Sequence, residues 1–356
     1  MSTPVKKVEK AESILQKRWR KFKTLKRGWY SFLLLSFLFA TSFLNPLFIN
    51  SRALVVQHDG QTRFPIMEGH IEARDLGQRA IGEANYRELK KQYAEAGEGD
   101  WVLMPLYPYH PNESLLKDPD LPGSPPHAPS ATHWMGTDDR ARDVFARLAY
   151  GFQLSIAFGL GVVTCAYMIG MTVGAILGFF GGRVDILGQR LVEIWAGLPF
   201  LYTVIIVSSL VRPTFLLLIP LLAIFRWVGI SFYMRGEFYR EKSKDYVAAA
   251  IAQGESNANI IFRHILPNSL TPIVSFAPFA LVGAISSLVS LDFLGFGMQP
   301  PTPSWGELVK QGLANISAWH LVFFPLGALF GTLIMVVFIG EAVREAFDPR
   351  TFSRLR

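Results

Sequence analysis

Residues 154–180 read LSIAFGLGVVTCAYMIGMTVGAILGFF and contain no charged side chain. An α-helix rises about 1.5 Å per residue, so about 20 apolar residues cross the hydrocarbon core of a bilayer, which is about 30 Å thick. This stretch is therefore predicted to be a transmembrane helix. Small residues within it would let neighbouring helices approach closely; they are Gly159, Gly161, Gly170, Gly174 and Gly178.

Five other apolar blocks have the length of a membrane span, namely 29–49, 187–210, 214–234, 269–291 and 319–342. Only 18% of the residues are charged, whereas soluble domains carry about a quarter. Together these features predict an all-α integral membrane protein with six transmembrane helices. The single cysteine, Cys165, excludes a disulfide framework and a cysteine-based metal site.

Basic residues are concentrated at the N-terminus, where residues 1–27 contain ten Lys or Arg and two Glu. A basic tail can bind nucleic acid. Directly before an apolar block, it is more typical of a segment held on the cytoplasmic side of a membrane, and we expect no nucleic-acid partner. A cleaved signal peptide is the alternative for 29–49, but the one cleavage-like site, Ala40-Thr41-Ser42, is weak and the apolar block continues beyond it.

The basic short loops fall on one side of the membrane if six helices alternate. Both termini are therefore expected to be cytoplasmic in a multi-pass protein. The predicted organisation is a basic tail (1–28), a first helix (29–49), an extracytoplasmic insert (50–145), a core of five helices (146–342) containing a cytoplasmic loop (236–268), and a C-terminal tail (343–356). The insert contains β-like runs at 53–56 and 64–67 and a predicted helix near 84–95.

The cytoplasmic loop has the most informative pattern. It predicts a short helix with an alanine surface, a glycine at which the chain leaves that helix in a left-handed conformation, and a second short helix. A proline then follows at the start of the next helix, where it is tolerated. Three adjacent alanines allow another body to approach closely. The residues that define the pattern are Asp245, Ala248, Ala249, Ala250, Gly254, Glu255, Ser256, Asn257, Ile260, Arg263, His264 and Pro267.

This loop resembles the coupling loop of ABC-importer permeases, and in particular the oligopeptide and dipeptide permeases. The family pattern is Glu-Ala-Ala, three residues, Gly, nine residues, and a hydrophobic-Leu-Pro ending. The match runs through Ala248-Ala249-Ala250, Gly254 and Ile265-Leu266-Pro267, but Ala248 stands where the family has Glu. The resemblance implies that this Glu contacts the ATPase; Asp245 or Glu255 would have to compensate for it here.

Other segments resemble the same permeases, in the same order along nearly the whole chain. They are His133-Trp134-Met135-Gly136-Thr137-Asp138-Asp139, Arg142-Asp143-Val144, Arg147-Leu148, Leu291-Asp292-Phe293-Leu294-Gly295-Phe296-Gly297, Pro300 to Glu307, and Gly340 to Arg350. Each motif is degenerate, but their order and spacing together are specific.

The resemblance implies a type I ABC importer permease of the bacterial inner membrane that moves peptides or peptide-like solutes by alternating access. Its implied partners are a second homologous permease, two ABC ATPase subunits, a periplasmic solute-binding protein and the lipid bilayer. The chain lacks a G-x-x-x-x-G-K-[ST] phosphate loop. It is therefore expected to bind no cofactor, to carry no catalytic residue, and to leave ATP and Mg²⁺ to the partner ATPases.

The candidate translocation path follows small residues of the fifth helix and two intramembrane charges. These residues are Gly283, Ala284, Ser286, Ser287, Ser290, Arg226 and Glu193. Buried charges are costly in a membrane, so Arg226 would either pair with Glu193 across the helical hairpin or meet a peptide carboxylate in a water-filled path. Asp292, at the outer end of the fifth helix, is expected to cap the chain at the interface, and His320 to lie at the membrane surface.

No metal site is predicted, because His127 and His133 do not have zinc-ligand spacing. The serines have no paired His and Asp, so a membrane-embedded hydrolase has no support. Two alternatives remain open. One is a stand-alone secondary transporter or channel, and the other is an ABC permease for a non-peptide solute such as a nickel chelate or a sugar. The insert would either dock the binding protein or shield the outer mouth.

Overall fold

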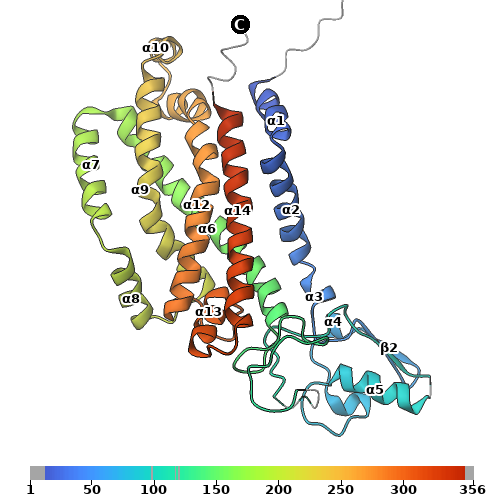
Figure 1. The fold of residues 1–356 in the computed structure, drawn as a ribbon. Helices are drawn as coiled ribbons and strands as arrows, with labels where there is room; N and C mark the ends of the chain where they lie inside the picture. Colours follow the sequence, from blue (N-terminus) through green and yellow to red (C-terminus); the bar gives the residue numbers. More distant parts are fainter. Residues whose placement is uncertain (1–12, 98, 117, 119–120, 349–356) are drawn as a thin grey trace, which may run out of the picture.

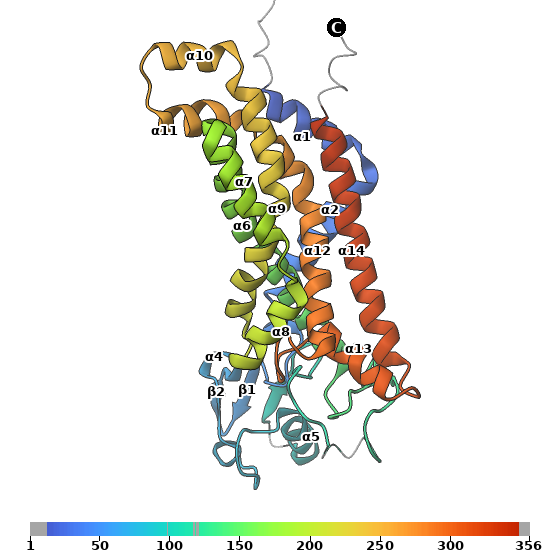
Figure 2. The ribbon, with the colours of Figure 1, turned by 90° about the vertical axis from the view of Figure 1, so that its left-hand side faces the viewer.

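The computed structural model describes residues 13–97, 99–116, 118 and 121–348, which form a bundle of long helices with a small three-stranded domain at one end (Figure 1). The predicted tails therefore lie partly outside the described residues, at 1–12 and 349–356. The helices α10 (Asp245–Ala252) and α1 (Ile14–Thr24) and the C-terminal end of α14 (His320–Phe347) lie at one end of the bundle, named here the α10 end. The small helix α13 (Trp305–Ala314) lies at the opposite end, named the α13 end (Figure 2).

Among the described residues, four helices are long and apolar enough to cross a membrane: α6 (Val144–Phe180), α9 (Phe215–Lys242), α12 (Thr271–Leu294) and α14. The predicted spans at 154–180, 214–234, 269–291 and 319–342 all lie within or close to these helices. At about 1.5 Å per residue, the 37 residues of α6 extend well beyond a hydrocarbon core.

The other two predicted spans have a different form. The block at 187–210 is divided between α7 (Gly182–Ala196) and α8 (Phe200–Leu210), which meet at 68°. Gly197 and Pro199 occupy the break, and Pro199 precedes the first turn of α8. The block at 29–49 forms α2 (Lys26–Ser42), only 17 residues long, and the turn α3 (Asn45–Phe48). By length and composition the described residues thus contain four spans, or five with the bent pair, and the predicted count of six is not confirmed.

The glycines of α6 form its closest contact with α9. A β-carbon at Gly170, Gly174 or Gly178 would collide with backbone carbonyl oxygens of Trp227, Ser231 and Arg235, respectively. These glycines are four residues apart, so they lie on one face of α6 and leave room for the α9 backbone. The predicted close helix approach is confirmed.

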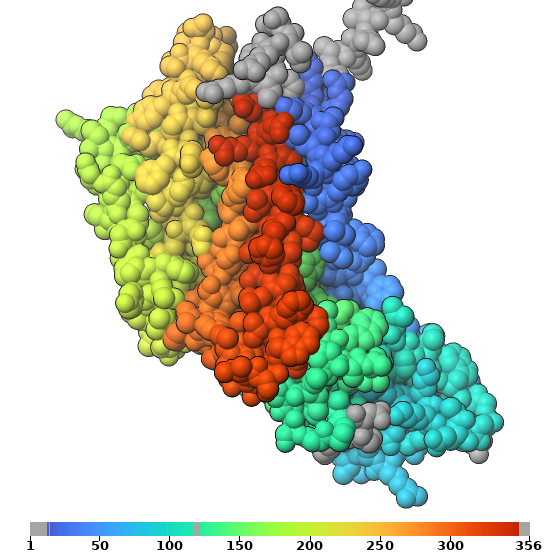
Figure 3. Space-filling model, in the orientation of Figure 1, coloured from blue at the N-terminus to red at the C-terminus, as the bar shows by residue number. Residues whose placement is uncertain are grey.

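The three-stranded domain contains the antiparallel sheet β2-β1-β3, with β1 (Val55–His58), β2 (Gln61–Arg63) and β3 (Trp101–Leu103). The turns α4 (Pro65–Glu68) and η1 (Ala73–Leu76) and the helix α5 (Tyr86–Ala96) complete it. In Figure 3 it projects beyond the bundle and to one side. The prediction of a helix near 84–95 is confirmed, but the β-like run at 64–67 is wrong, because Pro65 begins a helical turn there.

Candidate functional site

The loop between α9 and α12 forms a helical hairpin at the α10 end. Helix α10 is followed by α11 (Asn257–Asn259), the π-helical turn η2 (Ile260–Ile265) and the 3₁₀ turn η3 (Leu266–Asn268). Figure 2 shows this hairpin projecting beyond the ends of α6 and α9. Pro267 lies in the first turn of η3, which agrees with a proline at the start of the next helix, and the long helix α12 begins at Thr271 with Pro272 in its first turn.

Gly254 makes the reversal between the two arms of the hairpin. Its φ of +77° lies in the left-handed region, and its amide donates to the Ile251 carbonyl (3.0 Å). A β-carbon there would meet no atom of the described chain within 4 Å. The backbone therefore favours glycine, while the space outside it is open to another molecule.

An apolar root anchors the hairpin to the bundle. Val247 and Ala250 of α10 and Ile260 and Ile265 of η2 are buried, and they belong to one cluster with Phe238. Burying this face on both arms means that the hairpin moves with the end of α9 and the start of α12 rather than as a free loop.

Polar contacts brace the same root. The Tyr246 hydroxyl donates to Glu241 Oε2 (2.9 Å), and the Lys244 ammonium donates to Glu241 Oε1 (2.8 Å). Burial and the hydrogen bond to Glu241 raise the pKa of Tyr246 to about 12, so its hydroxyl stays protonated at neutral pH. Sequence reasoning missed Tyr246 and Glu241 because their contact depends on how α10 folds back.

The outer surface of the hairpin is apolar and exposed. Ala248 and Ala249 face away from the root, Ile251 is 53% exposed and Phe262 is 68% exposed. Exposed apolar side chains thus occur on both arms of the hairpin, Ile251 on α10 and Phe262 on η2, and together they offer an apolar surface to another molecule. Phe262 was not among the predicted residues, although its place between the glycine and the proline was a usable signal.

Some of the remaining predicted loop residues bond within the hairpin, and the others are exposed. Glu255 lies 3.0 Å from His264 Nε2, and Ser256 accepts a hydrogen bond from the Asn259 amide (3.3 Å) as the N-cap of α11. Asp245, Asn257 and Arg263 are exposed. Of the two carboxylates expected to compensate for Ala248, Asp245 therefore faces outward, and Glu255 is engaged by His264.

The two intramembrane charges do not pair with each other, so that interpretation is wrong. Arg226 donates to the Gly283 carbonyl (3.1 Å) and to the Ser287 hydroxyl, which connects α9 to α12. Glu193 instead accepts a hydrogen bond from Arg190 (2.5 Å), one turn earlier on α7. Helix α7 does reach α9 at this depth, where the Trp195 indole donates to the Ile224 carbonyl (2.6 Å), but the two charges take other partners.

Arg226 lines a cavity of about 220 Å³ between α6, α9 and α12, together with aromatic side chains that include Tyr233 and Phe276. Of the predicted path residues, Gly283 and Ser287 contact this guanidinium, whereas Ala284 is fully buried among apolar side chains. Ser290 is exposed and donates to the Ser286 carbonyl of its own helix (2.8 Å). Two of the predicted path residues, Gly283 and Ser287, thus contact Arg226, whereas Ala284 contributes to apolar packing between helices.

At the α13 end, the resembling motifs meet in one buried ionic cluster of Asp138, Arg142, Arg147 and Glu307, named here the Asp138–Glu307 cluster. Arg142 donates to Asp138 (2.7 Å) and to Glu307 (3.1 Å), and Arg147 donates to Glu307 (2.5 Å). The side chains of Arg147 and Asp138 are fully buried. Burial alone would lower the pKa of Arg142, but Asp138 and Glu307 outweigh it and raise the pKa, so the Arg142 guanidinium stays charged.

A second buried group lies beside this cluster. Asp143 caps α6 by accepting from the Ala146 amide (2.8 Å), and it also accepts from the Tyr107 hydroxyl (2.6 Å) and lies 2.8 Å from His133 Nδ1. His320, the first residue of α14, is buried, and its Nε2 lies 3.0 Å from the Thr137 carbonyl; its place at the membrane interface stays a prediction.

Asp292 follows the predicted capping role. Its carboxylate accepts hydrogen bonds from the Met298 amide and from the Ser304 hydroxyl, each at 2.6 Å. These bonds hold the loop that leaves α12 and lead it into α13. Asp292 therefore connects the α12 end to the Asp138–Glu307 cluster, through the helix that carries Glu307.

Metal-ligand atoms come together at one place in the part of the chain that the structure describes: His58, Asp59 and Asp100. His58 Nδ1 lies 2.7 Å from the Tyr93 hydroxyl and 3.3 Å from Asp100, and Asp59 is mostly exposed. Hydrogen bonds already account for this geometry, and we assign no metal to it. His127 and His133 contact different partners, Thr137 and Asp143.

With a membrane-spanning bundle, a projecting loop hairpin and an ionic cluster at the other end, the chain has the features of a transporter subunit. Residues 170–353 match the model of the binding-protein-dependent transport system inner membrane component, and the chain belongs to this family. It is a multi-pass inner-membrane protein and a permease subunit with the type I ABC importer fold. ATP hydrolysis is carried out by separate subunits of such transporters.

Curated relatives agree with this assignment. The inner membrane ABC transporter permease protein YejE of Escherichia coli is 38% identical over 94% of this chain and 96% of its own length. The peptidoglycan transport system permease protein YejE of Agrobacterium fabrum is 36% identical over 95% and 94%. The dipeptide transport system permease protein DppC of Bacillus subtilis is 34% identical over 69% and 75%.

Proposed function

We propose that the chain forms half of the channel of an ABC importer for peptides or peptide-like solutes, and that the α10–η3 hairpin couples this channel to an ATPase. The observation that carries the proposal is the structure of the hairpin. It has a buried root that is continuous with α9 and α12, and its two arms expose the apolar side chains of Ile251 and Phe262. Such a lever transmits movement of a docked partner to two membrane helices at once.

The proposed orientation follows from the same hairpin. An ATPase works where ATP is found, so the α10 end would face the cytoplasm, together with α1 and the end of α14. The basic residues of α1 and of the hairpin agree with this orientation. The predicted domain boundaries at 28, 49, 145, 235 and 342 are kept as part of this proposal, although α9 continues to Lys242 and α14 to Phe347. The three-stranded domain would lie in the periplasm.

The proposed partners are two ATPase subunits carrying ATP and Mg²⁺, a periplasmic binding protein and a second homologous permease. A surface for the second permease is suggested by α7 and α8, where apolar side chains are widely exposed in the single chain. At the ATPase contact we assign Asp245 the role of the family's glutamate, because its side chain is exposed and lies three residues before Ala248.

The named relatives include a peptidoglycan transport permease and a dipeptide permease, which supports a peptide-like solute. Within the bundle, Arg226 supplies a cation beside a small cavity and is exposed in the single chain. We propose that it binds the terminal carboxylate of the solute, with Ser287 and Gly283 holding the guanidinium in place.

Replacing Arg226 by Gln is expected to lower uptake of peptides with a free carboxylate about tenfold or more, because a hydrogen bond to a charged group contributes about 1.5–3 kcal/mol. Uptake of the same peptides as C-terminal amides should change little. Ser290→Ala is the matched control, since that hydroxyl bonds only within its own helix. Equal losses for acids and amides would argue against carboxylate recognition.

The function is tested by purifying the chain from its native host and reconstituting the retained complex in liposomes. We expect a second permease and two ATPase subunits to be retained, and peptide uptake to require both ATP and a binding protein. Solute identity follows from mass spectrometry of the ligand held by the co-purified binding protein. Uptake by this chain alone, without ATP, would instead establish the stand-alone transporter.

A further inference from the structure

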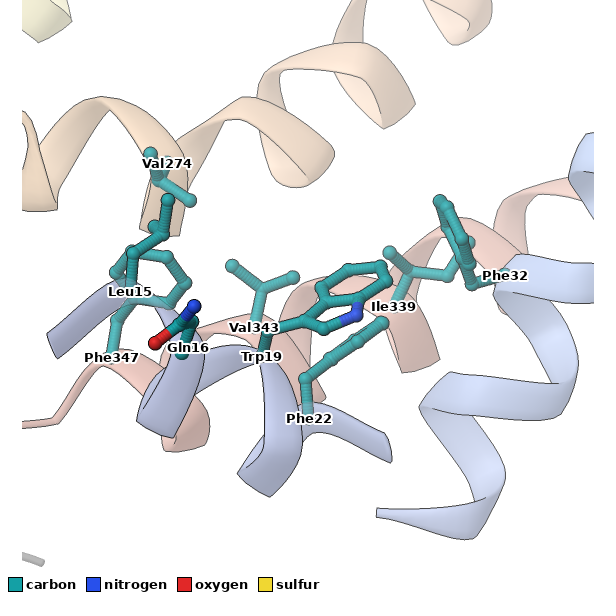
Figure 4. A pocket seen from close by; sticks show the side chains of 9 residues that line it. All are labelled: Leu15, Gln16, Trp19, Phe22, Phe32, Val274, Ile339, Val343 and Phe347. Carbon is teal, nitrogen blue, oxygen red and sulfur yellow. The ribbon is translucent and has the colours of Figure 1, made fainter. Parts of the chain in front are cut away.

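An apolar pocket of about 430 Å³ lies at the α10 end, between α1, the start of α12 and the end of α14. Trp19 and Phe22 of α1 form one wall, while Val343 and Phe347 of α14 and Val274 of α12 close it (Figure 4). The one polar residue in the lining is Gln16, whose side-chain oxygen accepts a hydrogen bond from the Ser13 amide (2.9 Å).

Two basic side chains make cation–π contacts with aromatic residues of this pocket. The Arg18 guanidinium lies 4.7 Å from the centre of the Phe347 ring, and the Lys23 ammonium lies 5.6 Å from that of Trp19. Helix α1 carries five basic residues and no acidic one. The pocket is therefore apolar inside and strongly positive on the helix that forms its wall.

The pocket continues into a second apolar groove of about 480 Å³ along α2, with Phe32, Val274, Ile339 and Val343 lining both. On α2 the second groove is lined further by Ser36 and Phe39. The pocket and the second groove together form one apolar groove, named here the α1–α14 groove, which runs from the basic helix α1 along the side of the bundle.

We propose that the α1–α14 groove binds one anionic phospholipid, with an acyl chain along its apolar lining and the phosphate at Arg18 and Lys23. An acyl chain needs no hydrogen bond from this apolar lining, and a phosphate supplies the anion that matches Arg18 and Lys23 beside it. The charge of α1 matches an anionic headgroup and not a zwitterionic one. Placing the lipid in the cytoplasmic leaflet rests on the orientation given with the proposed function.

The lipid would connect α1 and α2 to α12 and α14. Since α12 carries both Gly283 and Ser287 and follows directly from the coupling hairpin, the bound chain would hold the outer helices against the part of the bundle that moves during transport. An anionic leaflet would then favour the assembled, closely packed form of the permease.

The test measures the phospholipid retained by the complete complex in detergent after exposure to phosphatidylglycerol or phosphatidylcholine, using native mass spectrometry. We expect one phosphatidylglycerol to be retained in preference to phosphatidylcholine. The double variant Arg18→Gln/Lys23→Gln should weaken that retention roughly thirtyfold, because each basic residue near anionic lipid contributes about a factor of five. Arg18→Lys/Lys23→Arg, which keeps both charges, should retain the lipid.

A second pair of variants tests the groove without changing charge. Ser36→Trp fills it and should displace the lipid, while Leu34→Trp, two residues away on the exposed surface of α2 and outside both linings, should not. Equal retention of the two lipids, or unchanged retention in the neutralised double variant, would overturn the proposal. So would loss of the second permease rather than of lipid in Ser36→Trp, because a protein would then occupy the groove. Selective lipid retention by a complex that fails to take up peptides would count against the proposed function alone.

Discussion

Gly254→Trp in the assembled transporter is expected to abolish most of the solute-stimulated ATP hydrolysis. A β-carbon at this position meets no atom of the described chain within 4 Å, so a bulky side chain there would extend from the hairpin into the space proposed for the ATPase. Loss of a central docking contact costs about 2 kcal/mol or more, which corresponds to about thirtyfold in affinity. Stimulated hydrolysis and peptide uptake are the measurements, made on complexes of matched composition.

Backbone strain alone must be separated from loss of docking, and the chain offers a matched control. Gly97 ends α5 with φ +66°, and a β-carbon there also meets nothing within 4 Å. Gly97→Trp therefore imposes a similar left-handed strain of about 1–2 kcal/mol, but in the three-stranded domain. Unchanged coupling in Gly254→Trp, or equal losses in both variants, would reject the lever.

Glu307→Gln is expected to destabilise the permease by about 3 kcal/mol or more. The substitution keeps the shape of the side chain but leaves Arg142 and Arg147 with Asp138 as the one remaining carboxylate of the cluster. Removing one partner from a buried ionic network leaves an uncompensated charge, which costs about 3–5 kcal/mol. Thermal unfolding of the purified complex at several salt concentrations measures the effect.

Glu193→Gln is the control, because it removes an ion pair of the same length that is exposed rather than buried. Arg190 and Glu193 also approach to 2.5 Å, but their side chains are 72% and 45% exposed, whereas those of Arg147 and Glu307 are 0% and 14% exposed. Exposed pairs contribute about 0–1 kcal/mol. We expect Glu193→Gln to leave the unfolding midpoint nearly unchanged, and equal shifts in the two variants would contradict the role assigned to burial.

Several elements were predictable because their cause is local. Uninterrupted apolar runs identify α6, α9, α12 and α14, since a bilayer selects for length and hydropathy. The glycine at 254 predicted the reversal of the loop, and the glycines of α6 predicted its close contact with α9. The coupling-loop pattern was readable for the same reason, as its helix, turn and second helix occupy adjacent residues.

Other features depended on distances that a sequence does not contain. Arg147 and Glu307 are 160 positions apart and meet only because α13 folds back onto the start of α6. Arg226 had a carboxylate at a plausible depth in Glu193, yet it bonds Ser287, while Glu193 bonds Arg190. Helix α7 does contact α9 nearby, where the Trp195 indole donates to the Ile224 carbonyl (2.6 Å), so helix proximity alone did not decide the pairing. Phe262 is one apolar residue among many until the fold leaves it exposed.

The amino-acid sequence by itself determined the membrane environment, the helical class and the position of the coupling hairpin, because hydropathy, glycine conformation and helix period act over a few residues. Only the tertiary structure decided which charges pair, which apolar side chains stay uncovered and where a groove remains between α1, α2, α12 and α14. Those outcomes depend on how whole helices pack, and a change of a few ångströms between helices separates an ion pair from an isolated charge.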